Sequence, residues 1–148
     1  MKKVFVCVIA VCSIFLHSCS ISNVVVSSND NLSDYDYVVL TNEKTGDENI
    51  DHILMMVEKE ILATRLIETS PSTAKDLVCQ GKKVLSPVIN ITSHKWGGGD
   101  TYIMVNFYDY TTNKSVMKIK SSEIDIPISK NQDDAINTIR KELMKNFK

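Results

Sequence analysis

Hydrophobic residues follow two different patterns within residues 35–67. A short apolar run from Tyr35 to Leu40 is rich in β-forming residues and predicts a buried strand. After a polar stretch, apolar residues recur three and four positions apart. This spacing predicts an amphipathic helix over 50–67, with Asn49 or Asp51 as its N-cap. The apolar positions of this helix are Ile50, Ile53, Leu54, Val57, Ile61 and Leu62.

The second half of the chain predicts a hairpin followed by a helix. Residues 84–92 indicate a strand, in which Pro87 marks a sheet edge or a bulge because it has no backbone N–H. A polar turn at 111–114 joins two further strands, 101–110 and 115–126. The first of these alternates, with Ile103, Val105 and Phe107 on one face and Tyr102, Met104 and Tyr108 on the other.

An apolar stripe predicts a final helix over 133–147, preceded by a capping box at Ser129–Gln132. The segment 68–83 is ambiguous, and a short element over 74–79 is an open alternative there. The order of elements predicts an α+β fold with two layers: a mainly antiparallel sheet of three to five strands and two helices packed on one face. We expect a single domain over 34–148.

The N-terminal residues follow a different pattern, typical of a cleaved signal peptide over 1–18. Lys2 and Lys3 precede an apolar stretch from Val4 to Leu16. At about 13 residues, this stretch is shorter than the roughly 20 needed to span a bilayer. It therefore predicts export rather than a permanent membrane helix.

The four residues Leu16-His17-Ser18-Cys19 resemble the lipobox of bacterial lipoproteins. This resemblance implies cleavage between Ser18 and Cys19, a diacylglycerol thioether on Cys19 and an acyl chain on its new amino group. Two or three acyl chains hold a protein firmly on a membrane. The resemblance thus implies a lipid-anchored protein of the cell envelope, and Ser20 favours the outer membrane, facing the periplasm.

Residues 19–33 are mostly small and polar, and we expect them to form a tether between the lipidated cysteine and the domain. The alternative is that the triplet Val24-Val25-Val26 pairs as an edge strand.

Composition and charge narrow the class of protein. The chain has 148 residues, of which 43% are hydrophobic, and 17 Lys and Arg balance 18 Asp and Glu to a net charge of -1. This balanced net charge argues against nucleic-acid binding, which needs clustered Lys and Arg side chains. We therefore expect a globular domain without a nucleic-acid partner.

The cysteines predict neither a disulfide nor a metal site. Cleavage would remove Cys7 and Cys12, and lipid would occupy Cys19, which leaves Cys79 alone. Val78 beside it, and the lack of a nearby His or Asn, favour a buried structural thiol over a nucleophile. No Cys or His spacing resembles a metal site, and we expect no cofactor besides the lipid.

The segment His94-Lys95-Trp96-Gly97-Gly98-Gly99-Asp100 is the strongest candidate for a binding loop. A phosphate loop would need a helix after the glycines, but a strand follows, so the glycines indicate a flexible hairpin tip. The side chains His94, Lys95, Trp96 and Asp100 could instead form a binding patch. The alternative is that Trp96 packs on the sheet edge beside Pro87.

The turn Asp109-Tyr110-Thr111-Thr112-Asn113-Lys114, together with the order of elements over 35–147, resembles small βαββα domains of bacterial envelope lipoproteins. Examples are the CsgG, TolB N-terminal and penicillin-binding-protein activator types. No catalytic triad or converging pair of acids is evident. We expect a non-catalytic binding or assembly module with a protein partner or a second copy. The alternatives are a small envelope hydrolase that uses Cys79 or the His94 loop, and a subunit of a secretion or fibre assembly.

Overall fold

The computed structural model describes residues 21–26, 31–41, 44–93, 101–123 and 128–148. Three predicted features lie outside these residues. They are the signal peptide with its cleavage site Ser18–Cys19, the lipidation site itself, and the candidate binding loop with His94, Lys95, Trp96 and Asp100.

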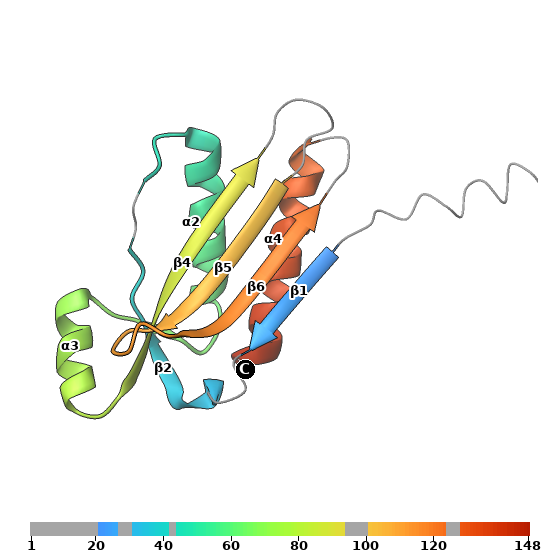
Figure 1. The fold of residues 1–148 in the computed structure, drawn as a ribbon. Helices are drawn as coiled ribbons and strands as arrows, with labels where there is room; N and C mark the ends of the chain where they lie inside the picture. Colours follow the sequence, from blue (N-terminus) through green and yellow to red (C-terminus); the bar gives the residue numbers. More distant parts are fainter. Residues whose placement is uncertain (1–20, 27–30, 42–43, 94–100, 124–127) are drawn as a thin grey trace, which may run out of the picture.

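The described residues form an α+β fold around one six-stranded sheet (Figure 1). The sheet order is β1-β6-β5-β4-β2-β3, antiparallel except where β2 pairs with β3 and β4. The predicted fold class is confirmed, with one strand and one helix more than expected. The elements are β1 (Ile21–Val26), η1 (Leu32–Asp34), β2 (Tyr35–Val38), α2 (Glu48–Leu62), β3 (Ile67–Glu68), α3 (Pro71–Cys79), β4 (Lys83–Ser93), β5 (Thr101–Asp109), β6 (Ser115–Glu123) and α4 (Ile128–Asn146).

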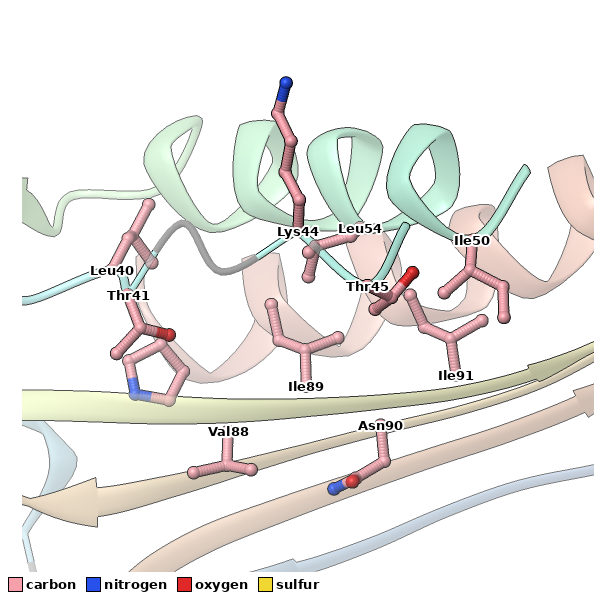
Figure 2. Close-up of a pocket in the computed structure, with 11 residues that line it drawn as sticks. Leu40, Thr41, Lys44, Thr45, Ile50, Leu54, Val88, Ile89, Asn90 and Ile91 are labelled. Atoms are coloured by element: carbon pink, nitrogen blue, oxygen red, sulfur yellow. The ribbon is translucent and has the colours of Figure 1, made fainter. Parts of the chain in front are cut away.

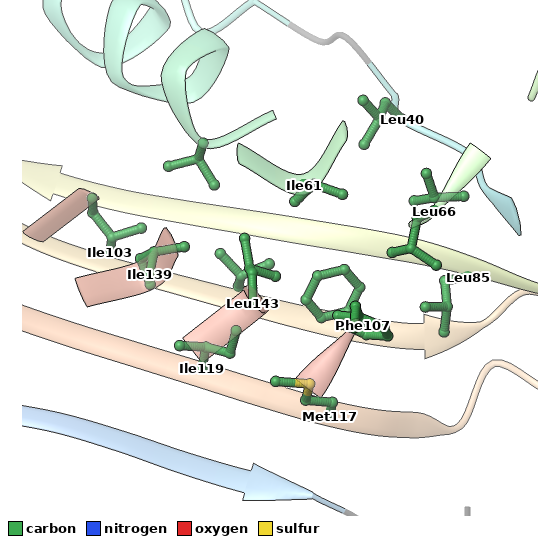
Figure 3. Close-up of a cluster of buried hydrophobic side chains, with 14 of the residues drawn as sticks. Leu40, Ile61, Leu66, Leu85, Ile103, Phe107, Met117, Ile119, Ile139 and Leu143 are labelled. Carbon is green, nitrogen blue, oxygen red and sulfur yellow. The ribbon is translucent and has the colours of Figure 1, made fainter. Parts of the chain in front are cut away.

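Helices α2 and α4 lie side by side on one face of the sheet and bury the main core against it (Figure 1). Their apolar stripes meet the inward residues of β4, β5 and β6 (Figure 3). Phe107 of β5 and Phe147 after α4 are in contact, with ring centroids 5.3 Å apart. The alternation predicted for 101–110 is confirmed, because Ile103, Val105 and Phe107 are each fully buried.

A bidentate ion pair joins the two helices. Arg140 on α4 donates to both carboxylate oxygens of Glu60 on α2, at 2.6 and 2.7 Å. Glu60 is only 5% exposed, and the hydrogen bonds from Arg140 hold the pKa of its carboxyl below the ordinary value.

Helix α2 begins and ends earlier than its apolar pattern predicts. Its N-cap is Asp47, whose carboxylate accepts the N–H groups of Asn49 and Ile50, rather than Asn49 or Asp51. Asp51 instead accepts two hydrogen bonds from Thr45, which hold the pKa of Asp51 below its ordinary value and fix the preceding loop. The helix ends at Leu62. Leu66 and Ile67, which the apolar pattern assigned to the helix, lie beyond it, and Ile67 belongs to β3.

Helix α3 resolves the ambiguous segment and lies on the opposite face of the sheet from α2 and α4. Ser70 caps it, and Pro71 occupies its first turn, where a missing N–H costs nothing. Ala74 packs with Val39 and Val84 in a small second core. The expectation of two helices on one face is met by α2 and α4, and α3 covers the β2 end of the other face.

The free tether expected over 19–33 is wrong for 21–26, because these residues form β1, the edge strand that was the alternative. β1 pairs antiparallel with β6 from Ile21↔Ser122 to Val26↔Met117. Val24 packs against the main core, and pairing satisfies the backbone groups on one side of β6. The sheet therefore begins at Ile21, with Ser20 alone between it and Cys19.

The edge predicted from Pro87 is confirmed. β4 pairs with β2 only as far as Leu85, and beyond this residue β4 has β5 as its one described neighbour. The predicted hairpin of β5 and β6 is confirmed as well, over shorter bounds. At its turn, Asp109 accepts the N–H groups of Thr111 and Thr112.

Candidate functional site

The sheet face opposite α2 and α4 is a candidate binding surface in the described part of the chain. Alternate residues of four strands point to this side, and α3 covers only the end near β2. We call it the open sheet face. It comprises Asn23, Val25, Val88, Asn90, Tyr102, Met104, Asn106, Tyr108, Lys118 and Lys120.

The open sheet face combines exposed apolar side chains with positive charge. Val25 is 57% exposed and Val88 is 46% exposed. Lys118 and Lys120 are consecutive outward residues of β6, and neither forms an ion pair with another described residue. In the register, Lys118 lies between Val25 and Asn106. Such a surface favours a partner that offers both apolar contact and negative charge.

A hydrogen-bonded group stiffens the centre of this face. Asn106 is only 6% exposed and donates from Nδ2 to the Tyr108 hydroxyl at 2.6 Å. Ser115 donates from Oγ to Asn106 Oδ1, also at 2.6 Å. Because both ends of the amide are satisfied within the face, Asn106 supports its neighbours and is not a free polar group.

An apolar groove of about 550 Å³ runs between the unpaired part of β4 and the start of α2. Figure 2 shows Ile89 and Ile91 pointing toward Ile50 and Leu54, whereas Val88 and Asn90 point to the other side of the sheet. Among the described lining residues, Lys44 alone carries an ionisable side chain. The groove therefore lacks the pair of titratable groups that general acid–base catalysis needs.

The outward side of α2 carries negative charge and exposed apolar residues. Glu48, Asp51 and Glu58 line a shallow hollow of about 490 Å³ together with Lys44, His52, Leu54 and Met55, and Met55 is 57% exposed. Burial raises the pKa of Glu58, and the charge of Glu68 adds to this effect. Leu62, 37% exposed, continues the same helix. We call Glu48, Asp51, Met55, Glu58 and Leu62 the acidic helix face.

The prediction that Cys79 is buried is wrong. Cys79 is an exposed free thiol at the last position of α3. Its helix buries Ala74, and the partly buried Leu77 and Val78 pack on the second core. Cys79 therefore falls outside the apolar stripe of α3, a fact that depends on how this short helix docks.

Two acids close to the start of β2, Asp34 and Asp36, form surface ion pairs. Asp34 pairs with Lys83 at 2.8 Å and Asp36 pairs with Arg65 at 2.6 Å, both at the surface. Within the described ranges, no three His, Cys, Asp or Glu residues gather in a way that could hold a metal ion. Likewise, none of the helices described is both long and apolar enough to cross a membrane.

Sequence reasoning missed Lys118 and Lys120. The signal was present, because these lysines alternate with Met117, Ile119 and Ser121, which the structure buries. This period-two pattern places both charges on one face of a strand. Which face stays uncovered, however, depends on where the helices pack.

No family model and no curated protein matches the chain. Similar solved structures are PelC dodecamers from Paraburkholderia phytofirmans. A single-residue variant of PelC superposes with a TM-score of 0.54 and 17% sequence identity, over 86% of this chain and 99% of that one. A second PelC crystal form gives 0.53 and 15%, with the same coverage. At these identities, the likeness shows that the chain shares the fold of a PelC subunit.

Proposed function

We propose that this chain is a lipid-anchored envelope lipoprotein that acts as a non-catalytic assembly module and binds further copies of itself. The open sheet face carries the proposal. It exposes Val25, Val88 and two lysines without described ion-pair partners, whereas helices bury the other face of the same sheet. An antiparallel sheet can leave one face in water, but such a face is ordinarily polar.

The comparison with solved structures supports self-association. Both similar structures are dodecamers of a subunit with this fold. The groove beside β4 also favours binding over catalysis. This groove is apolar, and Cys79 and His52 belong to helices on opposite faces of the sheet, α3 and α2.

The anchor follows from the N-terminal sequence and forms part of the proposal. After cleavage between Ser18 and Cys19, Cys19 would carry a diacylglycerol and an N-acyl chain. These chains would hold the protein on the outer membrane, facing the periplasm. Since β1 begins at Ile21, two residues extend at most about 7 Å from the lipid to the sheet. The domain would then lie against the headgroups with almost no tether.

Two measurements test the proposal. Labelled palmitate should enter the wild-type chain and not the Cys19→Ala variant, and incorporation into both would refute the anchor. Crosslinking of the lipidated protein in its own membrane, followed by light scattering of the detergent-purified protein, should give a homo-oligomer. A monomer at every concentration, with no crosslinked product, would refute self-assembly.

A further inference from the structure

We propose that copies of this chain associate head to tail, with the open sheet face of one copy docked on the acidic helix face of the next. This inference rests on the proposed self-assembly and specifies the two surfaces that meet. The occupant of the open sheet face is therefore α2 of a second copy.

The open sheet face lacks the helix layer that covers the other side of the sheet. On that other side, α2 and α4 fully bury Ile103, Val105 and Phe107 of β5. On the open side, α3 reaches only the β2 end, and Tyr110 contacts it through a hydrogen bond from its hydroxyl to the Pro71 carbonyl. A helix from a second copy would supply the missing layer over Val25, Val88 and Met104.

The two surfaces are complementary in charge and alike in apolar content. The open sheet face exposes Val25, which pairs with Lys118, and Val88, which lies two strands away beyond Asn106. The acidic helix face exposes Met55 and Leu62 beside three carboxylates, which outnumber the neighbouring lysines Lys44 and Lys59. Contact would bury apolar side chains on both sides and place the two lysines of the open sheet face near Glu48, Asp51 and Glu58, which favours association.

Charge also argues against a two-fold dimer through either surface. Two open sheet faces in contact would bring four lysines together, and this face includes no acid among its described residues. Two acidic helix faces would bring six carboxylates together, which Lys44 and Lys59 of each copy offset only in part. Like charges across an interface cost binding energy, so the pairing of unlike faces is favoured.

The two surfaces lie on opposite sides of the domain, so each bound copy can bind a further copy. The open sheet face and α2 lie on opposite sides of the sheet (Figure 1), so a copy bound through one surface keeps the other free. Contacts between two different surfaces of identical subunits produce closed rings or fibres rather than isolated dimers.

Charge reversal with rescue tests the two surfaces directly. The sheet variant carries Lys118→Glu and Lys120→Glu, and the helix variant carries Glu48→Lys and Met55→Lys. Each should weaken self-association of the lipidated full chain in detergent by about tenfold or more. The chain with all four changes should recover part of the association, because the lysines introduced on α2 would lie near the glutamates introduced on β6. Light scattering over a dilution series gives the association constants, and circular dichroism confirms that each variant is folded.

A matched control reverses two exposed lysines elsewhere, Lys141→Glu and Lys148→Glu, and should associate like the wild type. If the sheet and helix variants associate as strongly as the wild type, the two surfaces are wrong while self-assembly stands. A wild-type chain that stops at a dimer would overturn the head-to-tail arrangement. A wild-type chain that stays monomeric would instead overturn the proposed function. A four-change variant no better than its parents would refute direct pairing of the two faces.

Discussion

Replacing Phe107 by alanine tests which face of the sheet forms the core. Phe107 is 0% exposed, and its ring packs against Phe147, so the substitution leaves a cavity between β5 and the end of α4. Removal of a fully buried phenylalanine costs about 3–5 kcal/mol. A domain of this size has about 5–15 kcal/mol of total stability, so the loss is a large fraction of it. We expect a midpoint of thermal unfolding roughly 15 °C lower.

The matched control is Met104→Ala, three residues earlier on the same strand and on the open sheet face. Because Met104 remains partly exposed, its loss should cost about 1 kcal/mol or less. Urea unfolding followed by far-ultraviolet circular dichroism measures both variants at a concentration where the chain is monomeric, since association raises apparent stability. Equal losses for the two variants, or a loss below about 1 kcal/mol for Phe107→Ala, would refute the assignment of the core face.

Three further predictions follow from the contacts of single side chains. The pKa of Glu60 is lowered in the folded state, so its negative charge stabilises the fold above the unfolded pKa of about 4.3. This stabilisation is lost as the pH falls through the lower pKa of the folded state. Glu60→Gln should therefore reduce the decrease in urea midpoint between about pH 7 and about pH 3, and an unchanged pH profile would contradict the role of Arg140. Asp109 accepts hydrogen bonds from two N–H groups of the turn and, at 2.9 Å, from the hydroxyl of Tyr35. Asp109→Ala should therefore lower the free energy of unfolding in urea by about 1–2 kcal/mol. Asp109→Asn keeps an acceptor oxygen and should lower it less. Cys79 should react with a thiol reagent in the folded protein as fast as in urea, and strong protection would show that it is buried after all.

The two carboxyl groups differ in the origin of their shifts. For Glu60, hydrogen bonds from Arg140 are the main cause of the lowered pKa. For Asp109, burial raises the pKa, but the hydrogen bonds from Thr112, Tyr35 and Thr111 together outweigh it, so the net pKa is lowered. Both groups therefore stabilise the fold as carboxylates, and both contributions weaken in acid.

Local sequence patterns determined most of the secondary structure. The alternation of Ile103, Val105 and Phe107 identified the buried side of β5, and Pro87 identified the edge of β4, because both follow from local backbone geometry. The apolar N-terminal stretch and the lipobox-like residues before Cys19 are likewise local patterns, and the predicted export and lipid anchor rest on them alone.

Only the tertiary structure decided how these elements are partnered. Val24-Val25-Val26 could have been tether or strand, and pairing with β6, distant in sequence, settled it as β1. Cys79 is exposed because α3 docks with Ala74 toward the sheet. The open sheet face exists because α2 and α4 pack on the same side. Long-range packing, which no local pattern encodes, therefore decides where Lys118 and Lys120 become available to a partner.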